Sequence, residues 1–278
     1  MRRWRLARWA AILGIAAMPA GPAAWAAEAP DLLADSFNFA LGTFILETDT
    51  EVRLDGESGR GSQIDWERTF GDGDATRFRF DGTWRFADRH KLRALWFNNS
   101  VSQSRRLDRD ISWGDVVYPT SAEVDAEFEF DVYELAYEYV LLKRERYELS
   151  GTLGLHYTDL SLAIDGEGTV DGQPVAGGIR EEGSVGAPLP VVGVRGLWNL
   201  THSFWLDASA QFFALSIDDI DGNLQDYRFA VLWQPKTWLG VGAGYNQFTI
   251  DVDVTKDRFE GALDWTYRGP MLFYSASF

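Results

Sequence analysis

The residues best suited to chemistry in this chain are charged side chains at every second position of aromatic stretches. From Thr76 to Phe86, arginines alternate with phenylalanine and tryptophan. Successive side chains of a strand point to opposite faces, so such a stretch predicts one charged face and one apolar face. The residues predicted to lie on the charged faces are Arg77, Arg79, Arg85, Arg93, Glu127, Glu129, Asp131, Asp207, Arg228 and Asp264. Enclosed together, they could line an ion-selective pore or form a closed network of ion pairs.

Nucleophilic and acid–base chemistry has few candidates. Of the three histidines, His90 and His202 fall in predicted turns. The run His156-Tyr-Thr158-Asp159 faintly resembles the His-x-Ser-Asn run of outer-membrane phospholipases and lipid A deacylases, with Thr and Asp in place of Ser and Asn. Those enzymes work at the lipid side, whereas His156 falls on the polar face. There is no G-x-S-x-G, no H-E-x-x-H and no omptin-like Asp/His constellation. The sequence therefore predicts no enzyme, no catalytic residue and no cofactor.

Acidic segments offer oxygen ligands for cations. The clusters GDGD (71–74) and DDIDG (218–222) could hold Ca²⁺ or Mg²⁺, although no complete EF-hand loop is present. The alternative is a solvated acidic surface that meets lipopolysaccharide through divalent ions. We favour the second interpretation and predict no specific metal site.

Alternating strands must position all of these side chains. Short polar turns at 87–90, 143–146, 201–202 and 234–236 separate longer acidic or glycine-rich stretches at 56–74, 108–122, 166–184, 218–223 and 255–257. Short and long connections in alternation are typical of an all-β, antiparallel, up-and-down transmembrane barrel. We expect about ten strands, with eight or twelve as alternatives. They lie at 37–55, 75–86, 91–107, 123–141, 147–165, 183–200, 203–217, 223–234, 237–255 and 257–278.

Two positions suggest irregular strands. Near Val132 and Tyr133 the apolar residues switch phase, which a bulge would explain. The pair Gly269-Pro270 predicts either another bulge or a turn, and a turn would change the strand count.

The N-terminus and the composition indicate export. Residues 1–27 combine arginines, a ten-residue apolar run and the pattern Ala24-Trp25-Ala26, which predicts a cleaved signal peptide followed by one barrel domain at 28–278. Removing Arg2, Arg3, Arg5 and Arg8 takes the formal net charge from −16 to −20. Such an acidic chain lacks the basic face that nucleic acid requires. Without cysteine, it has no disulfide framework.

Aromatic residues near the strand ends favour a membrane barrel over a soluble one. Trp84, Trp198, Phe204, Trp233 and Trp238 are placed to form an interfacial girdle. The chain then ends in LFYSASF, with apolar or aromatic residues at alternate positions up to the last one.

This ending resembles the C-terminal signature of Gram-negative outer-membrane proteins, which the barrel-assembly machinery recognises. Tyr274 and Phe278 match its aromatic positions. The resemblance implies a location in the bacterial outer membrane, with membrane lipid and lipopolysaccharide as surroundings.

The sequence thus predicts a small porin-like or OmpW-like barrel, the latter from size and layout only. Its expected role is a narrow channel or a structural barrel with a charged lumen, and a small ten-stranded interior favours a filled or barely open lumen. The alternative is a surface protein whose acidic outer loops bind divalent cations, lipopolysaccharide or an external partner. A lipid-modifying enzyme is a third hypothesis.

Overall fold

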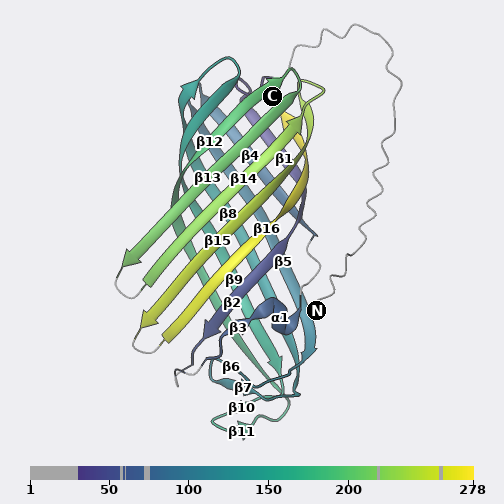
Figure 1. The fold of residues 1–278 in the computed structure, drawn as a ribbon, viewed down its shortest axis with the longest axis vertical. Coiled ribbons are helices and arrows are strands. Elements are labelled where there is room, and N and C mark those ends of the chain that lie inside the picture. Colours follow the sequence, from purple (N-terminus) through teal and green to yellow (C-terminus); the bar gives the residue numbers. More distant parts are fainter. Residues whose placement is uncertain (1–30, 57–58, 60, 72–75, 218–219, 257–258) are drawn as a thin grey trace, which may run out of the picture.

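Ten antiparallel strands close into a barrel in the computed structural model, which confirms the predicted all-β class and strand number (Figure 1). The structure describes residues 31–56, 59, 61–71, 76–217, 220–256 and 259–278, so the predicted signal peptide at 1–27 lies outside it. The wall consists of β1 (Phe37–Ile45) with its continuation β2 (Glu47–Leu54), β4 (Thr76–Ala87), β5 (His90–Arg106), β8 (Glu123–Lys143), β9 (Tyr147–Gly166), β12 (Ile179–Thr201), β13 (Phe204–Ile217), β14 (Ile220–Trp233), β15 (Leu239–Lys256) and β16 (Phe259–Ser277).

The last strand closes the ring against the first. β16 pairs with β15 on one edge and with β1 on the other, in register from Asn38 opposite Ser277 to Phe44 opposite Met271. Phe37 and Phe278 exchange backbone hydrogen bonds of 2.8 and 3.0 Å, and their rings lie 6.0 Å apart. The C-terminal residue is therefore fixed by pairing, and the membrane wall has no free edge.

The first wall strand breaks at Leu46, which the sequence did not predict. On the side of Phe278, β1 pairs with β4 and β16. Beyond the break, toward the other end of the barrel, β2 pairs with β3 (Ile64–Asp65) and β16. β16 runs straight past this break, so Gly269-Pro270 forms neither the bulge nor the turn considered above. Proline cannot donate to a ladder, and Pro270 lies where the neighbouring strand is interrupted.

The two ends of the barrel differ. Short connections join β4 to β5, β8 to β9, β12 to β13 and β14 to β15 at the end where Phe278 lies. At the opposite end β13 to β14 and β15 to β16 are equally short, so the long loops predicted at 218–223 and 255–257 were wrong. The other three connections there are long, and since long loops are extracellular in such barrels, the end of Phe278 is the periplasmic one. The opposite end carries the cap, which we define as β3, α1 (Trp66–Phe70) and the four-stranded sheet of β6 (Ile111–Trp113), β7 (Val116–Tyr118), β10 (Thr169–Val170) and β11 (Gln173–Pro174) (Figure 1). The predicted loops are thus partly an ordered structure.

Helices contribute little. None of those in the described residues is both long and apolar enough to cross a membrane.

The wall reverses its polarity part-way along each long strand. In β8 the even-numbered side chains are buried without interruption from Val124 to Val140. These inward residues are apolar up to Val132 and then include Glu134 and Glu138. The outward residues are acidic from 123 to 131 and apolar or aromatic from 133 to 141. No bulge occurs at Val132 and Tyr133, so that prediction was wrong. The strand leaves the lipid at this point. Its outward side chains change from apolar to acidic and its inward side chains change from charged to apolar.

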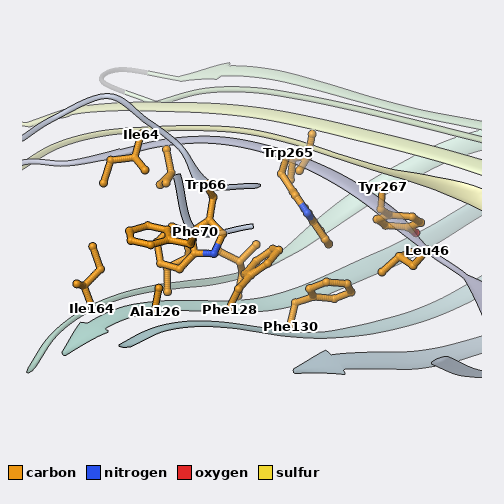
Figure 2. Close-up of a cluster of buried hydrophobic side chains, with 14 of the residues drawn as sticks. Leu46, Ile64, Trp66, Phe70, Ala126, Phe128, Phe130, Ile164, Trp265 and Tyr267 are labelled. Carbon is orange, nitrogen blue, oxygen red and sulfur yellow. The ribbon is translucent and has the colours of Figure 1, made fainter. Parts of the chain in front are cut away.

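On the side of the cap, the interior is a packed aromatic core. The rings of Phe130 and Trp265 lie 4.6 Å apart, and Tyr267 stacks on Phe248 at 4.7 Å. Figure 2 shows Trp66 and Phe70 of α1 entering the same cluster as Phe128 and Phe130. The core fills the part of the barrel nearest the cap. We call this part of the barrel and the cap together the extracellular extension.

Candidate functional site

An ion-pair network occupies the lumen within the membrane. Glu138, fully buried, meets Lys91 at 3.0 Å, Arg93 at 3.1 Å and Arg195 at 3.2 Å. Lys91 also contacts Glu148 at 2.5 Å. Further ion pairs bring more strands into the network: Arg85 with Glu148, Arg93 with Glu134 and Arg195 with Asp207.

A second branch centres on Asp81. This carboxylate receives Arg79 at 3.0 Å and Arg228 at 2.6 Å. Arg79 also donates to the Asn246 amide oxygen at 2.5 Å, and the Asn246 amide nitrogen donates to Asp226. The branch therefore joins β4 to β14 and β15 across the interior.

The network is balanced in charge. It holds six cations, Arg79, Arg85, Lys91, Arg93, Arg195 and Arg228, and six carboxylates, Asp81, Glu134, Glu138, Glu148, Asp207 and Asp226. Eleven of these twelve groups form ion pairs with one another, and Asp226 accepts a hydrogen bond from the Asn246 amide. An opposite partner offsets much of the cost of burying a charge. The arrangement thus resembles a structural plug more than a lining that attracts one sign of ion.

Five of the predicted lumen residues lie in this plug: Arg79, Arg85, Arg93, Asp207 and Arg228. Arg77 lies higher on β4. It donates to the Asn99 side chain and to the Ser100 carbonyl oxygen at 3.2 Å, so it braces β5 and not the plug.

Four predictions for the lumen were wrong. Glu127, Glu129 and Asp131 face outward from β8, and Asp264 faces outward beside the buried Trp265. Glu127 instead pairs with the exposed Arg180 at 2.7 Å. These acids lie in the extracellular extension, where the interior is apolar and water lies outside, so the polar face there is the outer one.

Several plug residues were missed by the sequence reasoning. They are Asp81, Lys91, Glu134, Glu138, Glu148, Arg195 and Asp226. Glu134 and Glu138 share the even-numbered phase of Phe128 and Phe130, the face that the sequence analysis left to the lipid. The signal that could have placed them inward is their position opposite the outward Tyr133, Leu135 and Tyr137.

A small cavity remains at the periplasmic mouth. Its volume is about 60 Å³, and its walls include Asp81, Arg85 and Trp205. Leu32 and Leu33 pack with Trp205 and Leu232 at this mouth. The Leu32–Leu33 segment therefore narrows the charged lumen from below.

The three histidines lie in the lumen and at the periplasmic turns. His156 is buried in the lumen, stacked on Phe248 at 4.8 Å, with its Nδ1 atom 3.3 Å from the Thr158 hydroxyl. His90 and His202 lie at the periplasmic turns. The described residues contain no group of three or more acidic or histidine side chains able to hold a metal ion. Most of the two acidic clusters considered above, Asp72 to Asp74 together with Asp218 and Asp219, lies outside the described residues.

The predicted girdle and terminal aromatics face outward. Trp84, Phe204, Trp233 and Trp238 are exposed near the periplasmic turns, and Trp198 is half-buried on the outward phase of β12. The other predicted outward pair, Tyr274 and Phe278, is also exposed. Their contact with membrane lipid or with the assembly machinery stays a prediction.

The extracellular extension also carries a polar groove that the sequence reasoning missed. Its volume is about 620 Å³, and we call it the arginine groove after Arg68, Arg105, Arg106 and Arg109. The remaining lining residues are Glu51, Gln63, Asp65, Thr69, Leu107 and Asp108. Only the pair Arg105-Arg106 is adjacent in sequence, and the fold brings the others beside it.

The rim of the groove is held by Asp110. Its carboxylate accepts hydrogen bonds from the Thr120 backbone N–H at 2.7 Å and from the Thr120 hydroxyl at 2.8 Å. These two bonds lower the pKa of Asp110 because they stabilise its charged form. The loop that carries Arg109 is thereby tied to the chain entering β8.

Comparisons with known proteins bear on the fold. No family model matches the chain, and no curated protein matches it. Among solved structures, the chain is similar to the outer-membrane protease OmpT of Escherichia coli, with 13% identity, coverage of 89% of this chain and 98% of that one, and a TM-score of 0.56. Ail of Yersinia pestis shows 11% identity, coverage of 87% and 97%, and a TM-score of 0.36. The toluene transporter TodX of Pseudomonas putida shows 9% identity, coverage of 88% and 90%, and a TM-score of 0.36.

At these identities the likeness concerns architecture alone, and of these three structures OmpT is the one with a TM-score above 0.5. Together with the ring closure, it shows that the chain has a closed β-barrel fold similar to that of OmpT.

Proposed function

We propose that the protein is a closed outer-membrane barrel that acts as a binding surface through its extracellular extension. The observation that carries this proposal is the filling of the interior at two successive levels. Within the membrane the ion-pair plug joins opposite walls, and above it the aromatic core excludes water.

The two levels would block ions for different reasons. An ion passing the plug would have to separate charge pairs that are already neutralised, which is costly in a buried site. An ion passing the aromatic core would lose its hydration without gaining polar ligands. Either level alone opposes conduction, and together they support a role outside the lumen.

The outer face of the extension supports binding. Beginning just above Tyr133, the outward residues of β8 are Asp131, Glu129, Glu127, Asp125 and Glu123. This stripe, which we call the acidic wall, starts where the apolar band ends and therefore at the level of lipid headgroups. Lipopolysaccharide is anionic there, so divalent cations shared between its phosphates and these carboxylates would hold the two together.

A narrow channel is the second candidate. It is favoured by the charged lumen and by the small cavity between the plug and the Leu32–Leu33 segment. It requires both the plug and the aromatic core to rearrange.

Planar-bilayer recordings test the choice between the two. We expect the folded wild-type barrel to be silent. We also expect silence from Arg93→Ala/Glu138→Ala, which weakens the plug but leaves the aromatic core in place. Heat-modifiable mobility on gels verifies folding of each sample. Discrete, reproducible conductance steps from wild-type protein would contradict the proposal and favour the channel.

Lipopolysaccharide retention tests the binding role. Wild-type barrel should co-purify with more lipopolysaccharide in Mg²⁺ than in EDTA, and Glu127→Gln/Glu129→Gln/Asp131→Asn should lose most of that difference. The control Asp88→Asn/Glu145→Gln removes exposed charge at the periplasmic turns and should retain it. Equal retention by all three proteins would remove the acidic wall from the proposal.

A further inference from the structure

The arginine groove lies at a gap in the strand pairing of the extracellular extension. β4 accompanies β5 only as far as Phe97, and β3 pairs with β2. Beyond Phe97, β5 continues to Arg106 with β8 as its strand partner, and β3 and β5 are not paired with each other. The groove lies between these two unpaired edges, with α1 beneath it.

Three of its arginines have hydrogen-bonding capacity to spare. Arg106 donates to the Ser121 carbonyl oxygen at 3.1 Å, and Arg109 donates to the Gln63 carbonyl oxygen at 3.4 Å. Among the described residues, no ion pair involves Arg105, Arg106 or Arg109, whereas Arg68 pairs with Asp65 at 3.1 Å. Each guanidinium has five N–H donors, so most donors of this trio remain unused.

The groove also contrasts with its surroundings in charge. The chain has a formal net charge of −16, and the acidic wall of β8 presents only carboxylates above the apolar band. In the groove four arginines face three carboxylates, those of Glu51, Asp65 and Asp108. Two backbone carbonyls orient the guanidinium groups without neutralising them. Such an arrangement fits an anionic ligand with several oxygens.

We propose that the arginine groove binds the phosphate or sulfate ester groups of a saccharide. The planar guanidinium fork matches the oxygens of these tetrahedral anions, and two or more forks can share one group. This inference rests on the binding role proposed for the extension and names the ligand class of one site within it.

The height of the groove favours a sugar-borne anion over the lipid A phosphates. Ile45 and Trp96 are the last outward apolar residues of their strands, and the groove residues Glu51 and Arg105 lie six and nine residues farther along. With about 3.3 Å per residue and a strand tilt near 40°, the groove lies roughly 15–25 Å above the apolar band. Lipid A phosphates lie at the membrane surface, whereas sugar chains extend through this height.

Binding of defined polyanions to the detergent-folded full barrel tests the proposal. The probes are dextran sulfate, with neutral dextran as its control, and lipopolysaccharide with either a phosphorylated or a phosphate-free core, all in EDTA. The test variant is Arg105→Gln/Arg106→Gln/Arg109→Gln. The matched control Arg180→Gln/Arg268→Gln/Arg144→Gln also removes three exposed arginines, all outside the groove. Heat-modifiable mobility verifies folding.

We expect the test variant to raise the Kd for the anionic probes at least tenfold and to flatten the salt dependence of binding, while the control stays within about threefold. Preference for the phosphorylated core identifies a lipopolysaccharide ligand, and preference for dextran sulfate identifies a free glycan. The proposal is overturned if wild-type protein binds no anionic probe, or if both triple variants weaken equally. If the barrel is silent in bilayers but fails this binding test, only the anion site in the groove is refuted. If the barrel conducts, the proposed binding function is contradicted whatever the probes show.

Discussion

Glu138 is the residue on which the plug depends most. One carboxylate of β8 serves two cations from the adjacent β5 and one from β12, two strands away on the other side, and its side chain is fully buried. Removing one partner of a buried pair is costlier than removing the pair because a desolvated charge is left behind. The plug is therefore a set of mutually dependent residues and not a sum of independent bonds.

We predict that Glu138→Gln lowers the free energy of unfolding by about 3–5 kcal/mol, the usual cost of breaking a buried ion pair. The control Glu123→Gln lies on the same strand with an exposed side chain and should change stability by less than about 0.5 kcal/mol. Urea unfolding in lipid vesicles, followed by tryptophan fluorescence, measures both. Equal stability of the two variants would mean that water already screens Glu138.

At the level of elements, the meeting of three strands at Leu46 is the most constrained part of the wall. A Cβ atom built on Gly269 would lie 1.8 Å from the Ile45 carbonyl oxygen, where backbone has little room to move. β1 ends at Ile45 and β2 begins at Glu47, and β16 passes alongside both in one continuous register. Glycine here is required by close approach and not by a turn.

Gly269→Ala should therefore prevent or severely slow barrel closure. Gly222→Ala is the matched control, because the nearest atom to its added Cβ would be an aromatic carbon of Phe213 at 3.8 Å, an ordinary contact. Refolding yield in detergent, scored by heat-modifiable mobility, compares the variants. Wild-type yield from Gly269→Ala would show that the seam can widen without cost.

The strands, their number and the closing role of β16 could be predicted from the sequence because alternation is a local signal. The plug could be predicted only in part. Alternation identifies two faces, but which one is inward depends on whether lipid or water lies outside, and that changes along β8 between Asp131 and Tyr133. Glu127 and Glu129 were placed in the lumen for this reason. The arginine groove depends on contacts between segments distant in sequence, which no local pattern reveals.

For the whole molecule, the reversal of polarity sets the depth of the barrel. Shifting it along the membrane normal in one direction would place the acidic wall in hydrocarbon, and shifting it in the other would expose the apolar band to water. Both changes are unfavourable. The two environments are thus encoded on a single set of strands.

This reversal predicts different costs for an arginine introduced at two heights on β9. Leu153→Arg places a cation in the apolar band and should cost about 2–4 kcal/mol if that position lies near the bilayer midplane. Asp159→Arg, six residues farther along the same outward face, should be nearly neutral. Unfolding titrations in vesicles measure both. Similar costs at the two positions would place the bilayer boundary elsewhere.

The hydrogen-bonded meeting of Phe37 with Phe278 has a consequence for connectivity. Because the first and last wall strands are neighbours, the order of strands around the ring does not depend on where the polypeptide begins. A chain opened at the turn 144–146 and joined by a short linker from Phe278 to Phe37 would thread the same ring in the same cyclic order. In such a circular permutant the terminal phenylalanine would become internal, so the predicted recognition of the last residue during assembly could be tested separately from its role in the wall.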